Sequence, residues 1–154
     1  MKIGEALQEK KRLQARLAKC YELMKESYTY KGDKPNFSFE KLQNEADNII
    51  QKIKDLKIGI QNTNSKVKVK YEGSEHTLQE LIIDIADIRS KLAQLNALDT
   101  SDENRWYFLK SEEHEIKYQV SPEDIQQQIQ LLNIKKSTLD SLLQHINWTS
   151  QLIV

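Results

Sequence analysis

The chain has 154 residues, about the length of one domain, so it can bury a core without disulfides or metals. Charged residues make up 30% of it, but 23 basic and 23 acidic side chains cancel, so no overall field favours nucleic acid as a partner. The sequence shows neither an apolar secretory signal nor a run long enough to span a bilayer, and it has one cysteine; together these predict a cytoplasmic protein without a membrane partner.

The first two predicted helices span about residues 3–30 and 38–62, separated by the breaker-rich "KGDKPN". In the first, Cys20 lies on an apolar face, where we expect inert packing. The second gives the clearest pattern, because its apolar residues recur at alternating steps of three and four, the spacing of one helix face. These residues are Phe39, Leu42, Ala46, Ile49, Ile53, Leu56 and Ile60.

A β-like segment follows at about residues 66–76, where valine and tyrosine alternate with lysine before a turn at Glu72-Gly73-Ser74-Glu75. The third helix is expected at about 77–98. It begins beside Thr77, which forms a potential capping box with Glu80 three residues later.

A second β-like segment is expected at about 104–120, where "RWYFL" and "IKYQV" are rich in aromatic and β-branched residues. The fourth helix, about 122–147, starts with a Ser121 cap and Pro122 at the first helical position. The pattern predicts a single, mainly α domain of residues 1–154. Its four long antiparallel helices form a bundle or two hairpins, with a small β-hairpin or sheet between them.

Apolar residues beside the main stripes indicate a second packing surface. Ile50, Ile82 and Ile83 flank the core faces of the second and third helices. The simplest source of a partner surface is another copy of the chain, so we expect a homo-oligomer.

Two similar polar phrases close the second and fourth helices. Asn62, Thr63 and Asn64 follow Ile60, and "NWT" at 147–149 follows Ile146. If the two ends meet, their amides and hydroxyls and the indole of Trp148 would suit a small polar ligand that carries a ring. The alternative is that these groups satisfy one another and the loop backbone.

Several short motifs occur in an order that resembles the septicolysin-like family of small, mostly helical bacterial proteins. They are "IQNTNS", "HTLQELI", Arg105 before an aromatic pair, "EIKYQVS" and "INWTSQL", and they cover nearly the whole chain. The resemblance implies a helical fold and an intracellular bacterial origin, but the family has no assigned activity.

The resemblance also marks a set of candidate ligand-binding positions. Gln61 stands where a basic residue is expected before the "NTN" phrase, which weakens an anion-binding role there. The matching positions are Asn62, Thr63, Asn64, Arg105, Glu115, Lys117, Asn147 and Trp148, to which the second polar phrase adds Thr149.

No catalytic constellation, metal site or cofactor motif stands out. "SEEHEIK" groups a histidine with carboxylates, but neighbouring side chains on a strand point to opposite faces. We therefore expect a non-catalytic oligomeric scaffold or interaction protein first, and a small-molecule binder, perhaps of a nucleotide-like compound, second; an enzyme comes third. Arg105 distinguishes the first two hypotheses. Pairing with Glu115 favours the scaffold, whereas a position beside Trp148 favours the small-molecule binder.

Overall fold

The computed structural model describes residues 1–99 and 117–153. Most of the predicted β-like segment at 104–120, including Arg105 and Glu115, therefore lies outside the described residues. Within that segment, residues 117–120 are described and form neither helix nor strand.

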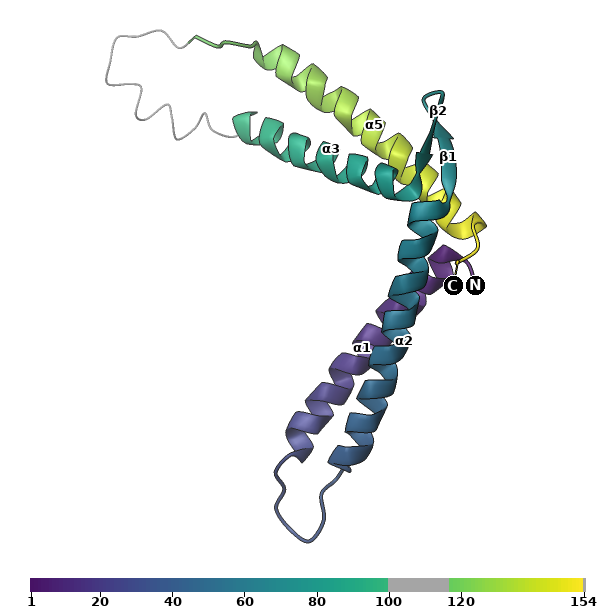
Figure 1. Cartoon of the computed structure of the whole chain (residues 1–154). Coiled ribbons are helices and arrows are strands. Elements are labelled where there is room, and N and C mark those ends of the chain that lie inside the picture. Colours follow the sequence, from purple (N-terminus) through teal and green to yellow (C-terminus); the bar gives the residue numbers. More distant parts are fainter. Residues whose placement is uncertain (100–116, 154) are drawn as a thin grey trace, which may run out of the picture. The chain divides into compact units, whose positions relative to one another are not determined.

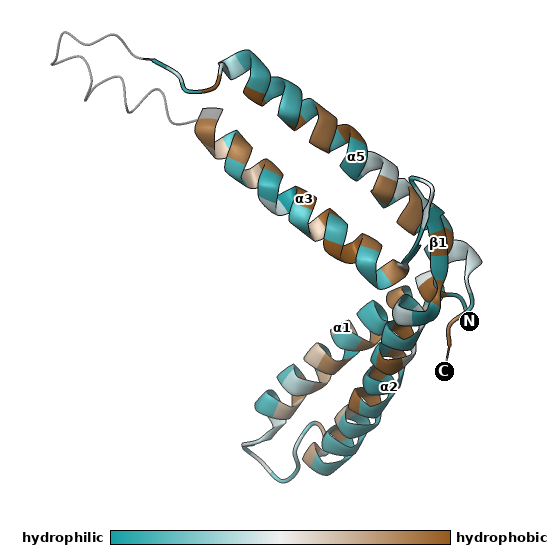
Figure 2. Ribbon diagram, turned by 45° about the horizontal axis from the view of Figure 1, so that its top comes forward, coloured by the Kyte–Doolittle hydropathy of each residue, from teal (hydrophilic) through white to brown (hydrophobic). Residues whose placement is uncertain are grey.

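The prediction of a mainly helical chain with a small β-hairpin is confirmed. Figure 1 shows the described elements in chain order, and Figure 2 shows hydrophobic residues recurring turn by turn along the helices. The elements are α1 (Ile3–Ser27), α2 (Phe39–Lys66), β1 (Lys68–Tyr71), β2 (Ser74–Thr77), α3 (Leu78–Asp99) and α5 (Pro122–Thr149).

The chain divides into two compact units. The first contains Met1–Leu78 together with Gln144–Val154, and the second contains Gln79–Leu143. The last turns of α5 therefore belong to the first unit, while the rest of α5 belongs to the second. The predicted single domain stays a prediction.

In the first unit, α1 and α2 lie side by side around an apolar seam (Figure 1). Ser38 begins α2, and its Oγ accepts a hydrogen bond from the Lys41 amide. Arg16 and Glu45 form an ion pair across the two helices. The buried core residues are Leu13, Cys20, Ala46, Ile49 and Ile53, with Leu17, Met24 and Leu56 packed against them.

The β-hairpin is also part of the first unit. Its strands are antiparallel, with Lys68 opposite Thr77 and Tyr71 opposite Ser74. The turn places Glu72 at φ 49° and Gly73 at φ 83°. Positive φ at both central residues is the mark of a type I′ turn, whose twist matches that of the two strands.

In the second unit, α3 and α5 lie side by side in both ribbon views (Figures 1 and 2). A guanidinium nitrogen of Arg89 lies 3.2 Å from Asp140 Oδ1 and joins the helices. The predicted Ser121 cap is present, because its Oγ accepts a hydrogen bond from the Asp124 amide. Buried apolar residues follow one stripe of each helix: Leu81, Ile85, Ile88 and Leu92 on α3, and Ile129 and Leu139 on α5.

Two predicted helix ends are wrong. Helix α1 stops at Ser27 rather than near residue 30, and α2 continues to Lys66 rather than ending near 62. The second difference has a physical reason: Thr63 is fully buried, so a helical turn there is stabilised by packing. Asn62 and Asn64 are consequently helix-interior residues, and the extended backbone begins only at Val67.

Candidate functional site

Thr63, the centre of the first predicted polar phrase, holds the end of the chain in place. Its hydroxyl donates to the Gly59 carbonyl oxygen at 2.7 Å and accepts from the Ile153 amide at 2.8 Å. No side-chain polar atom buried in the described parts of the chain lacks a hydrogen-bond partner. The hydroxyl is thus engaged in structure from both sides.

The chain termini pair with each other beside this contact. The Ile3 amide donates to the Ser150 carbonyl oxygen at 3.2 Å, and the Leu152 amide donates to the Met1 carbonyl oxygen at 2.9 Å. We call residues 150–153 the C-terminal strap. In Figure 1 the marked ends of the chain lie close together, in agreement with these bonds.

Two glycines give the strap and the end of α5 close access to the first unit's helices. A Cβ added at Gly4 would lie 2.8 Å from the indole of Trp148. A Cβ at Gly59 would lie 3.1 Å from Leu152 Cδ2. The indole therefore covers the backbone of α1, although 47% of the residue remains exposed.

The other predicted site residues are placed as follows. Asn62, Asn64 and Asn147 are partly buried in the first unit. The Thr149 hydroxyl donates to the His145 carbonyl oxygen at 2.9 Å, a bond within its own helix. Lys117 is exposed and belongs to the second unit. A shared ligand pocket for the two polar phrases stays a prediction, as does the role of Arg105.

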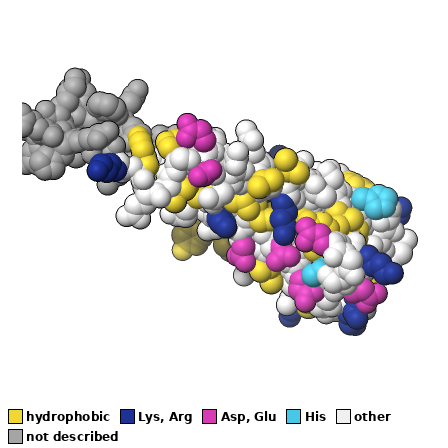
Figure 3. Space-filling view, turned by 90° about the horizontal axis from the view of Figure 1, so that it is seen from above, with side chains coloured by type: hydrophobic (Ala, Val, Ile, Leu, Met, Phe, Trp, Pro, Cys, Tyr) yellow, Lys and Arg dark blue, Asp and Glu magenta, His cyan; other side chains and the backbone are white. Residues whose placement is uncertain are grey.

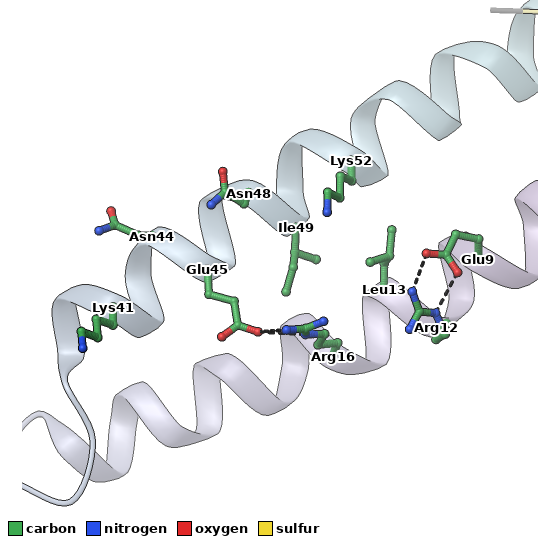
Figure 4. A pocket seen from close by; sticks show the side chains of 10 residues that line it. All are labelled: Glu9, Arg12, Leu13, Arg16, Lys41, Asn44, Glu45, Asn48, Ile49 and Lys52. Carbon is green, nitrogen blue, oxygen red and sulfur yellow. Dashed lines mark hydrogen bonds and ion pairs between the residues drawn. The ribbon is translucent and has the colours of Figure 1, made fainter.

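A groove between α1 and α2 was not predicted from the sequence. It encloses about 450 Å³, and its floor contains Leu13 and Ile49, each 4% exposed. Figure 4 shows these residues between the helices, with charged side chains along both walls. The walls are Glu9, Arg12 and Arg16 on α1 and Lys41, Asn44, Glu45, Asn48 and Lys52 on α2.

The charges of this groove do not balance. Arg12 donates twice to Glu9, each time at 2.7 Å, and the pKa of the Glu9 carboxyl is lowered mainly by this hydrogen bond. Arg16 donates to Glu45 from its Nε at 2.8 Å. Four cations thus face two carboxylates, and the excess positive charge lies on Lys41 and Lys52.

Helical spacing was the signal that could have identified each wall. Lys41, Asn44, Asn48 and Lys52 recur at steps of three and four, as do Glu9, Arg12 and Arg16. Such steps place residues on one side of a helix. Spacing does not reveal that the two sides adjoin, because that depends on how α1 rotates against α2.

Cys20 is buried in the apolar seam, as predicted. Desolvation raises the pKa of its thiol, with a smaller contribution from the negative charge of Glu45. Its environment therefore disfavours the reactive thiolate.

The helices of the second unit carry exposed apolar residues on the sides away from their buried stripes. Leu131 and Ile134 of α5 are 68% and 64% exposed, and Ile82 and Ile83 of α3 are 38% and 49% exposed. Figure 3 shows hydrophobic side chains reaching the surface along the helices next to the grey segment. Each helix thus carries one exposed apolar pair, and such pairs are candidates for an interaction surface.

Among residues 1–99 and 117–153, no group of three His, Cys, Asp or Glu side chains could hold a metal ion. No helix within the same ranges is both long and apolar enough to cross a membrane.

The fold and these surfaces define a class of protein built from long paired helices, with a charged groove on one pair and exposed apolar faces on the other. Residues 7–152 match the model of a Family of unknown function (DUF6847), and the chain belongs to that family. The septicolysin-like resemblance finds no support in this match.

A solved structure has the same fold. It is the crystal structure of a functionally unknown conserved protein from Corynebacterium diphtheriae, with a TM-score of 0.81 and 23% sequence identity. The likeness covers 99% of this chain and 98% of that one. Comparison with curated proteins gives no match.

Proposed function

We propose that the protein is a non-catalytic helical scaffold that self-associates through the exposed apolar faces of α3 and α5. The observation that carries this proposal is the high exposure of Leu131 and Ile134 on a helix whose neighbouring solvent-facing residues are mostly uncharged. The proposal also assigns the chain to one domain and to the cytoplasm, as its composition predicts.

Both faces are poor in charge. At 100° per residue, the solvent side of α3 carries Ile82, Ile83, Ala86, Ser90, Ala93 and Ala97 with one carboxylate, Asp87, and that of α5 carries Gln127, Leu131, Ile134, Thr138 and Ser141 with one, Glu123 in its first turn. Burying uncharged side chains avoids the desolvation cost of ions. Two copies of a face that carries a single carboxylate also meet with little repulsion between like charges, which suits a symmetric dimer.

Each of the two faces is small by itself. Helix α3 has 22 residues and is about 33 Å long at 1.5 Å per residue, and a helix is about 10 Å wide. Each face lies on the side away from the buried stripe and offers on the order of 330 Å². A standard specific interface buries roughly 800 Å² per partner, so residues that flank a face must also contact the second copy.

Light scattering coupled to size-exclusion chromatography tests the proposal. Wild-type protein at micromolar concentration is expected to elute as a dimer or larger assembly. The Leu131→Glu/Ile134→Glu double variant should shift toward the monomer, because it introduces carboxylates at the centre of the contact.

The matched control replaces an exposed isoleucine outside these faces. Ile58→Glu changes a residue of α2 that is 47% exposed and that shares its side with Asp47 and Lys54. This variant should keep the wild-type mass, and circular dichroism should show that both variants remain helical. A monomeric wild type, or equal dissociation of both variants, would contradict the proposal.

A further inference from the structure

The charged groove between α1 and α2 continues into a second, apolar cavity. The second cavity encloses about 360 Å³ and shares Glu9, Leu13 and Lys52 with the first. Its other lining residues are Met1, Asp55, Leu56 and Leu152. One continuous depression of the first unit therefore changes from cationic to apolar along its length.

The apolar end is held in shape by the C-terminal strap. The Leu152 amide is bonded to the Met1 carbonyl oxygen, and the side chain of Leu152 lies against Gly59. The Ile153 amide is bonded to Thr63. Leu152 is thus a fixed wall of the apolar cavity, since both it and its neighbour are tied to the body of the unit.

The cationic end has charge to offer a ligand. Arg12 and Arg16 are each paired with a carboxylate, whereas Lys41 and Lys52 form no ion pair within the described ranges, although the charge of Lys52 acts on the Glu9 carboxylate and contributes to its lowered pKa. Asn44 and Asn48 add amide groups to the same wall. The carboxylate of Asp55 lies at the apolar end and accepts a hydrogen bond from Gln51 at 2.8 Å.

We propose that this groove binds a free single-chain amphiphile, an alkyl chain with an anionic carboxylate or phosphate head group. The head lies beside Lys52, where the cationic and apolar parts of the groove meet, and Lys41, about 16 Å away along α2, attracts it only through its longer-range field. The alkyl chain lies over Leu13 and Leu56 against Leu152, where its burial releases water.

Calorimetric titration with a series of fatty acids below their micelle concentrations tests this proposal. Octanoate, decanoate and dodecanoate share one head group and differ only in chain length. Burial of each methylene contributes about 0.8 kcal/mol, so the affinity should rise about fourfold for each added methylene that the cavity covers. Dodecanol, which lacks the charge, should bind more weakly than dodecanoate.

Variants locate the site. Lys41→Gln/Lys52→Gln should weaken dodecanoate binding by about tenfold, because it removes the charge-assisted contact of Lys52 and the longer-range attraction of Lys41. The control Lys54→Gln/Lys57→Gln removes two exposed lysines from another side of α2 and should bind as wild type does. Leu152→Ser should weaken dodecanoate more than octanoate, and equal melting temperatures of the lysine variants would exclude a general loss of fold.

Several results would overturn the proposal. Absence of binding is one, and affinity that does not depend on chain length is another, because it would mean that only an anion is bound. Equal loss in the lysine variant and its control would place binding elsewhere. Binding to phosphatidylglycerol vesicles without binding to the free fatty acids would assign the groove to a membrane surface instead.

Discussion

The contact between Gly4 and Trp148 predicts that one substitution changes sign with its background. Gly4 is buried in the first turn of α1, and the ring of Trp148 covers it. A Cβ at this position would lie 2.8, 2.9 and 2.9 Å from three indole carbons. Gly4→Ala therefore forces the ring or the helix to move, whereas Gly4→Ala in a Trp148→Ala background does not.

Two opposing effects determine the magnitude. Overpacking by one methyl group costs about 1–3 kcal/mol, and replacing glycine by alanine in a helix contributes up to about 1 kcal/mol in the other direction. We expect Gly4→Ala to destabilise the wild type by roughly 1–2 kcal/mol. In the Trp148→Ala background the same change should be neutral or stabilising by up to about 1 kcal/mol.

Urea unfolding of the four proteins, followed by circular dichroism, measures the coupling between the two sites. A coupling free energy of about 1–3 kcal/mol is expected, since the two residues are in contact. Additive effects would refute the reasoning. They would mean that the indole does not rest on α1, and the ring of Trp148 would then be available to a ligand.

Three further predictions concern single residues. Thr63→Val should lower the free energy of unfolding by about 1–3 kcal/mol in urea titrations, because the Ile153 amide loses its acceptor. Thr63→Ser keeps that acceptor, so the Ile153 amide should stay protected in hydrogen exchange. Gly73→Ala should cost about 1–2 kcal/mol in thermal unfolding, since φ is 83° there, and a neutral effect would disprove the turn. Arg12→Gln should raise the pKa of Glu9, which NMR shifts of the carboxyl group can follow. Pairing with Arg12 lowers the pKa of Glu9 in the folded state. The pair therefore stabilises the fold at pH values above the unfolded-state pKa, and this stabilisation is lost as the pH falls through the folded-state pKa.

The sequence alone determined the class of fold, because the relevant signals are local. Apolar residues at steps of three and four define one helix face whatever lies opposite, and the Ser121 cap acts on an amide three residues away. The turn at Gly73 likewise depends on backbone angles that few residue types adopt.

Tertiary structure decided where α2 ends and what the polar phrases do. Two asparagines around Thr63 resemble a helix end, but the helix continues because Thr63 is buried and bonded to Ile153, a residue 90 positions later in the chain. A local pattern holds no information about so distant a partner.

The charged groove was hidden from sequence reasoning for the same reason. Each of its walls is a row of polar residues that, on an isolated helix, only faces solvent. The rows become one groove with an apolar extension when α1 turns its Arg16 toward Glu45 on α2 and the C-terminal strap adds Leu152. The sequence thus determined the helices and their apolar faces, whereas the rotation of one helix against another, set by the packing of many side chains at once, decided which surfaces a ligand can meet.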